Sequence, residues 1–173
     1  MTEAEIDAEF ERTQPIGHAI NALAQAEAII ARIIEDYADA AERMRAAGLD
    51  GIELEAYGHL MDQFWSPLTN ALDGPYGGDL DNRLRFTFDT LRAIRARVGD
   101  DFIVGVRYTG DEDMPGGLTR TDGLEISRRL RDCGMVDFLN VVKGHIDTDA
   151  ALTEPRSIRH ASSPDKPPCL CCL

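Results

Sequence analysis

Amphipathic helical segments alternate with short apolar segments through the middle of the chain, and no other feature constrains its fold as strongly. Apolar side chains spaced three and four residues apart predict two helices, over about residues 24–48 and 82–98. Candidate capping residues before residue 122 and a stop near Cys133-Gly134 predict a third, over about residues 122–133. Strands are expected over residues 51–55, 102–108 and 136–142, and the run over 102–108 is apolar without clean alternation, as in a parallel strand covered on both faces. Strands that alternate with helices pair in parallel through right-handed crossovers, so we expect an α/β fold.

The same spacing names the side chains that each helix should bury. The first helix is expected to bury Ile30, Ile33, Ile34, Tyr37, Ala41 and Met44. The second is expected to bury Leu84, Phe88, Leu91, Ile94 and Val98. Asn82 is placed to cap the second helix, and Thr121 or Asp122 to cap the third.

The alternation alone does not separate a closed barrel from an open, doubly wound sheet. The chain has 173 residues, whereas a closed (β/α)8 barrel needs about 250. Residues 25–154 carry the pattern, and residues 1–24 form a poorly defined N-terminal segment. Residues 155–173 are rich in proline with little apolar periodicity, so we expect them to be disordered or the product of a reading-frame error.

Charge and composition argue against several classes of function. A formal charge of −13 repels nucleic acid and anionic lipid, so we expect no nucleic-acid or membrane partner. The acidic first residues are unlike a secretory signal, and no apolar run reaches about 18 residues, which favours a cytoplasmic protein. Three of the four cysteines lie in the terminal CLCCL, which lacks the CxxC spacing of metal sites, so no metal centre is expected.

Three motifs follow one another along the chain. GLDGIELEAYGHLMDQFWSPLTN spans residues 48–70, YGGDLDNRLRF spans residues 76–86, and FIVGVRYTGDE spans residues 102–112. In this order and spacing they resemble the old yellow enzyme family of FMN-binding (β/α)8 barrels. The resemblance covers roughly residues 33–153 and the fourth to sixth strands of that barrel. It implies a partial (β/α)8 TIM barrel of about three consecutive β/α units.

The segment ELEAYGHLMDQFWSPLTN is most similar to the branch of the family that oxidises N-methylated amines and amino acids, such as dimethylglycine or N-methylproline demethylases. The resemblance implies an FMN-dependent oxidoreductase whose parent transfers a hydride from a small N-methylated substrate to the flavin. Two alternatives stay open, an ene-reductase acting on α,β-unsaturated carbonyls and a non-catalytic truncated remnant. An unrelated open α/β binding domain has no Gly-rich phosphate loop to support it.

Barrel enzymes place their chemistry at the C-terminal ends of strands, which here selects Glu55, Tyr57 and His59 as catalytic candidates. Ene-reductases of the resembled family carry a His-x-x-His or His-x-x-Asn pair here and a proton-donating tyrosine. In this chain the corresponding motif is one residue shorter. Glu55 and Tyr57 lie near the positions of the pair, and His59 aligns with the tyrosine. An ionised glutamate only accepts hydrogen bonds, so it suits an ammonium group better than an enone oxygen. Tyr57 can add a cation–π face.

Each of these candidates also has a structural alternative. Glu55 can form a salt bridge in the barrel mouth, and His59 can make a structural hydrogen bond instead of transferring a proton. By resemblance, Arg107 is the arginine that contacts the flavin and stabilises the negative charge of its reduced form. The alternative for Arg107 is an ion pair with one of three acidic neighbours: Glu53, Asp111 or Glu112.

Lys143 and His145 follow the third predicted strand and are expected to line the substrate pocket. Phosphate binding in such barrels uses the loops after strands seven and eight, which the motifs do not include. We therefore expect FMN to be bound by the full-length parent and weakly or not at all by this chain. Unpaired strand edges allow a homo-oligomer.

Overall fold

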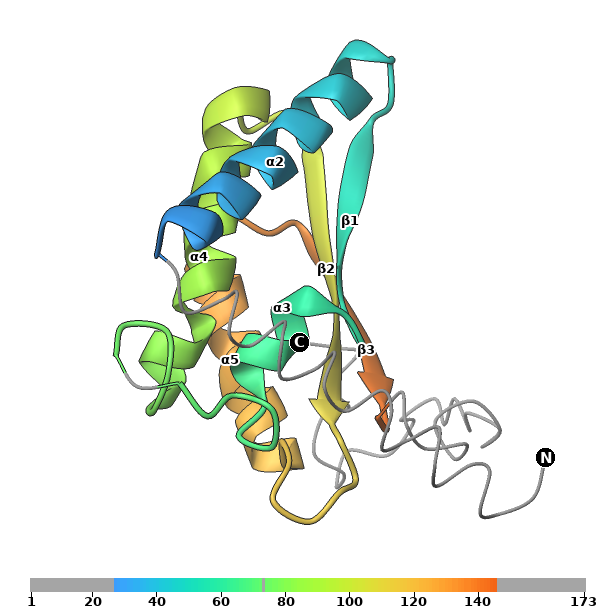
Figure 1. The fold of residues 1–173 in the computed structure, drawn as a ribbon. Coiled ribbons are helices and arrows are strands. Elements are labelled where there is room, and N and C mark those ends of the chain that lie inside the picture. The colour runs from blue at the N-terminus through green and yellow to red at the C-terminus, as the bar shows by residue number, and fades with distance from the viewer. Residues whose placement is uncertain (1–26, 73, 146–173) are drawn as a thin grey trace, which may run out of the picture.

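The computed structural model describes residues 27–72 and 74–145 as a sheet with helices on one side (Figure 1). Its parallel strands follow the order β1-β2-β3 and span Gly51–Ala56 (β1), Ile103–Asp111 (β2) and Phe138–Lys143 (β3). The helices span Glu27–Ala46 (α2), Leu60–Trp65 (α3), Leu80–Val98 (α4) and Arg120–Asp132 (α5). The expected α/β class and the parallel pairing of consecutive strands are confirmed.

The sheet has one covered and one open face, because successive side chains of a strand point to opposite sides. On the covered side, Val104, Val106 and Tyr108 of β2 are completely buried in the core shared with the helices. On the other side, Ile103 and Phe138 are 46% and 43% exposed. Within the described part of the chain, no helix covers this second face, and the outer edges of β1 and β3 have no strand partner.

Helices α2 and α4 pack against each other and form most of the helical layer (Figure 1). The Tyr37 ring meets the Phe86 ring edge-on, with 6.3 Å between ring centroids. The predicted stripe of α4 is buried, apart from the half-buried Phe88. Met44 was expected on the buried stripe of α2 but is 43% exposed, so that stripe ends at Ala41.

The helix starts differ from the predicted ones. The Asp79 side chain accepts a hydrogen bond from the Asn82 backbone N–H at 2.9 Å, so the cap of α4 is Asp79, and the prediction of Asn82 was wrong. In α5 the cap is Thr119, which exchanges hydrogen bonds with Asp122 in a capping box. Helix α3 has no counterpart among the predicted elements.

The poorly defined segment predicted for residues 1–24 and the tail predicted for residues 155–173 lie outside the described residues. The three clustered cysteines of CLCCL lie there too. Among the helices of residues 27–72 and 74–145, none has the length and apolar character needed to cross a membrane.

Arg95 ties the end of α4 to the starts of β2 and β3. Its side chain is only 11% exposed, and its Nη2 donates to Asp137 Oδ2 at 2.7 Å. The same carboxylate oxygen accepts the Val104 backbone N–H at 2.7 Å. Its Nε and Nη1 donate to three backbone carbonyl oxygens, those of Gly99, Phe102 and Met135.

These bonds make the stability of the chain sensitive to acid. The Val104 N–H and then the Arg95 guanidinium hold the pKa of Asp137 below its usual 3.8. A depressed pKa in the folded state adds stability above the unfolded pKa, and that stability is lost as the pH falls through the folded value. We expect Asp137→Asn to be less stable than wild type in urea at pH 7, with the difference shrinking below pH ~4. A constant difference between pH 7 and pH 3 would contradict this assignment.

Candidate functional site

The carboxyl ends of the three strands meet at one edge of the sheet, and parallel pairing fixes which residues lie level with one another. Glu55 of β1 pairs with Arg107 of β2, and Arg107 pairs with Asn140 of β3. These residues alternate with Leu54 and Val106, which are buried on the helix side, so their side chains lie on the open face. The structure thus places a carboxylate, a guanidinium and an amide in one row.

Glu55 and Arg107 form an ion pair across this row. Arg107 Nη1 lies 3.6 Å from Glu55 Oε2, and the two side chains are 34% (Arg107) and 37% (Glu55) exposed. Glu55 Oε1 and Arg107 Nε are both buried and have no hydrogen-bond partner among the described residues. Buried polar atoms in native proteins are nearly always bonded, so each side chain keeps one atom that a ligand can satisfy.

The ion pair answers one question that the sequence left open. An ion pair was the structural alternative for both Glu55 and Arg107, and it forms between the two. None of the three acidic neighbours expected for Arg107 is its partner. The pairing of β1 with β2 decides the outcome, because it sets Glu55 level with Arg107 and Glu53 level with Gly105.

Tyr57 extends the site beyond the end of β1. Its ring lies against the Arg107 guanidinium, with 5.8 Å from Arg107 Cζ to the ring centroid. His59 follows two residues later as the N-cap residue of α3, and its side chain is exposed and makes no capping hydrogen bond. Of the four residues expected to share the site, the structure brings Glu55, Tyr57 and Arg107 into contact and leaves His59 at the rim of the same loop.

The loop that carries Tyr57 and His59 is anchored through α3. The Gly58 backbone N–H donates to Asp62 Oδ2 at 2.5 Å. Three residues further, the Trp65 indole Nε1 donates to Thr87 Oγ1 of α4 at 2.7 Å. Both Asp62 and Trp65 are buried, so α3 is a fixed base for the loop above it.

A second buried carboxylate, Glu112, fastens the loop that follows β2. Its Oε2 accepts the Ser66 hydroxyl at 2.7 Å and the Leu118 backbone N–H at 2.6 Å. A Cβ atom at Gly117 would lie 2.3 Å from the same oxygen, so glycine is needed for this close approach. Glu112 therefore joins the end of α3 to the β2–α5 loop and takes no part in the Arg107 ion pair.

Lys143 and His145 lie at the end of β3, as their sequence positions require. Lys143 is exposed, and its Nζ lies 2.7 Å from Asp113 Oδ2. His145 is only 8% exposed, and its charge acts on the Asp62 carboxyl. Their predicted role in lining a substrate pocket stays a prediction.

Asn140 is a further candidate that the sequence analysis did not single out. Its Nδ2 donates to Glu53 Oε2 at 3.2 Å, across the strand between them. The available signal was a single amide within the apolar run FLNVV. Only the pairing of β2 with β3 shows that this amide stands beside Arg107.

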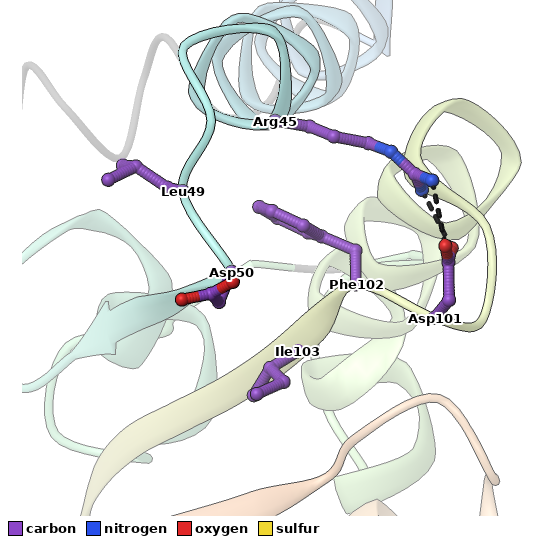
Figure 2. Close-up of a pocket in the computed structure, with 6 residues that line it drawn as sticks. All are labelled: Arg45, Leu49, Asp50, Asp101, Phe102 and Ile103. Atoms are coloured by element: carbon purple, nitrogen blue, oxygen red, sulfur yellow. Dashed lines mark hydrogen bonds and ion pairs between the residues drawn. The ribbon is translucent and has the colours of Figure 1, made fainter.

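A pocket of about 470 Å³ lies at the opposite end of the sheet (Figure 2). It is lined by Arg45, Leu49, Asp50, Asp101, Phe102 and Ile103. The Arg45 guanidinium is already paired with the Asp101 carboxylate through bonds of 2.9 and 3.0 Å, which Figure 2 shows as dashed lines. The pocket adjoins the amino-terminal ends of β1 and β2 and is separate from the row of Glu55, Arg107 and Asn140.

Comparisons with known proteins identify relatives of this chain. Over 125 residues the chain is 70% identical to a probable N-methylproline demethylase of Rhizobium meliloti (strain 1021), covering 72% of this chain and 18% of that protein. Over 137 residues it is 47% identical to an N,N-dimethylglycine/sarcosine dehydrogenase of Chromohalobacter salexigens, covering 79% of this chain and 20% of that protein. The chain thus spans about a fifth of the length of these two relatives.

A solved structure, the old yellow enzyme homologue from Zymomonas mobilis, matches 69% of this chain and 34% of its own chain, with a TM-score of 0.59 and 28% identity. The expected partial (β/α)8 barrel of about three β/α units is confirmed. The model of the NADH:flavin oxidoreductase / NADH oxidase family matches residues 6–158. With more than half of its length matched, the chain belongs to the NADH:flavin oxidoreductase / NADH oxidase family.

Proposed function

We propose that the chain is a segment of an FMN-dependent oxidoreductase that demethylates a small N-methylated amine or amino acid. The observation that carries the proposal is the Glu55 carboxylate, which lies on the open face at the tip of β1 and has one buried, unsatisfied oxygen. An ionised carboxylate attracts a substrate ammonium group and has no hydrogen to donate to an enone oxygen. The names of the two relatives, which specify N-methylproline and dimethylglycine, support the same substrate class.

The residues around Glu55 complete the proposed site. Arg107 lies over one face of the Tyr57 ring, so we propose that the opposite face meets the substrate cation, an attraction of about 0.5–2 kcal/mol depending on desolvation. Glu55 orients the ammonium group from beside Arg107, whose Nη1 lies 3.6 Å from Glu55 Oε2. His59 lies at the rim of the same loop, where we propose that it exchanges protons with the substrate or with water.

The chain also has a residue that fits the flavin. Arg107 is a cation on the open face, and its Nε hydrogen is buried without an acceptor in the described residues. Such a donor suits the electron-rich edge of the flavin ring system. When bound, FMN would supply the acceptor for the hydride of the N-methyl group. The bound ammonium group must first lose its proton, so that the nitrogen lone pair can form the iminium bond as the hydride leaves. Arg107 would hold that edge where negative charge gathers on reduction.

A chimaera tests the proposal. The segment of this chain that matches the Rhizobium meliloti relative replaces its counterpart there, and the relative supplies the rest of the barrel. Flavin absorbance is followed after anaerobic mixing with N-methylproline or dimethylglycine, and the unmodified relative is the reference. We expect the amine to bleach the flavin. A chimaera that binds flavin and ignores both amines, but whose chemically reduced flavin is reoxidised by 2-cyclohexenone, would instead establish an ene-reductase.

The 173-residue chain by itself is expected to bind FMN weakly. A charge-assisted hydrogen bond contributes about 1.5–3 kcal/mol, which falls short of the roughly 4 kcal/mol that a Kd of 1 mM requires. Quenching of FMN fluorescence on titration with the chain measures the affinity. Flavin that stays bound through gel filtration would show that the chain holds a phosphate site as well.

A further inference from the structure

The contact between Tyr57 and Arg107 depends on the short connection that leads from β1 into α3. Tyr57 precedes Gly58, whose φ of +71° lies in the left-handed region that side chains disfavour. The Gly58 backbone N–H ends on Asp62 Oδ2 at 2.5 Å, which is a short bond to a carboxylate. The turn is thus held by one backbone donor and one side chain.

Burying the Asp62 carboxyl beneath this turn is energetically unfavourable. It is only 4% exposed, and its second oxygen, Oδ1, is buried without a hydrogen-bond partner among the described residues. A neutral residue would avoid this cost of burial. The carboxyl therefore has a role that its burial alone does not explain.

Charged groups from neighbouring elements act on Asp62 in opposite directions. Burial raises the pKa of Asp62, and the Gly58 N–H and the Gln63 side chain oppose this rise. The charge of His145, beyond β3, also lowers the pKa of Asp62, whereas Glu112, beyond β2, raises it. Asp62 thus lies where the ends of all three strands influence a single carboxyl.

We propose that Asp62 is a positioning residue, whose carboxyl fixes the Gly58 N–H and thereby holds the Tyr57 ring against the Arg107 guanidinium. The inference rests on the proposed function only for its consequence, that the ring face opposite Arg107 is then held ready for a substrate cation. The geometric part concerns this chain alone and needs no flavin.

The test is NMR spectroscopy of the full 173-residue chain, comparing Asp62→Asn with wild type. The amide keeps an acceptor oxygen of similar shape and loses the charge. The Gly58 N–H bonds a neutral amide oxygen less strongly than it bonds the Asp62 carboxylate. We therefore expect Gly58 amide exchange to become roughly tenfold faster. Nuclear Overhauser contacts between the Tyr57 ring and the Arg107 side chain should weaken with it. Exchange at Leu91, buried in α4, reports global opening and should not change.

Glu112→Gln is the matched control, because Glu112 is equally buried but bonds Ser66 and Leu118 instead of the Gly58 loop. It should not speed Gly58 exchange or weaken the Tyr57–Arg107 contacts, because removing the Glu112 charge favours the ionised form of Asp62. The proposal is overturned if Asp62→Asn leaves both measurements unchanged, or if Glu112→Gln disturbs them as much. In the chimaera, Asp62→Asn should raise KM for the amine, and this effect should vanish when Tyr57 is already alanine. A chimaera that oxidises no amine contradicts the proposed function and leaves the NMR result standing.

Discussion

Replacing Arg95 with alanine is expected to destabilise the chain by about 2–3 kcal/mol, because it removes the shared partner of three backbone carbonyls and of the half-exposed Asp137 carboxylate. The guanidinium satisfies three carbonyl oxygens and the Asp137 carboxylate. Without it, a carboxylate that also bonds the Val104 N–H loses its cation. Urea unfolding followed by the fluorescence of Trp65, the single tryptophan, measures the change.

Arg97 provides the control for Arg95, since it lies on the same helix two residues further on. It pairs with three acidic side chains of α2, Glu35, Asp39 and Glu42. All of these pairs are solvent-exposed, and exposed ion pairs contribute little to stability. Arg97→Ala should therefore shift the urea midpoint much less than Arg95→Ala. Equal shifts would mean that Arg95 is not the residue that joins α4 to the starts of β2 and β3.

The elements that the sequence predicted well are those with long, regular patterns. The stripe of α4 and the apolar run of β2 each extend over several turns or residues, and tertiary packing preserves both. Helix α3 escaped prediction because six residues cannot show a helical period. Cap residues were misplaced for a similar reason: Asp79 and Asn82 are both good caps, and only the observed bond distinguishes them.

The candidate site was predictable to the level of strand ends and no further. Parallel strands bring their carboxyl ends together, which is enough to place Glu55, Tyr57 and Arg107 in one region. The choice of Glu55 over Glu53 as the partner of Arg107 requires the register, since both lie on the same face of β1 and a shift of two residues would exchange them. Asn140 needs the register of β3 as well.

Glu55→Gln in the chimaera is expected to lower kcat/KM for N-methylproline on the order of 50-fold, the cost of losing a charge-assisted contact to the substrate cation. The variant keeps the size of the side chain and removes its charge. It also releases Arg107 from its ion pair. The flavin spectrum and the flavin content of the purified chimaera must therefore match those of the unsubstituted chimaera before the rate is interpreted.

Glu53→Gln separates the role of Glu55 from a general effect of negative charge on the open face. Glu53 lies two residues earlier on β1, on the same face, and bonds Asn140 instead of Arg107. Because Glu53 is further from the strand tip, its replacement should change kcat/KM less than about threefold, a difference of roughly 0.65 kcal/mol. If Glu53→Gln impairs amine oxidation as strongly as Glu55→Gln, the substrate cation responds to the charge of the whole face. A specific contact between Glu55 and the substrate cation requires that only Glu55→Gln lower kcat/KM strongly.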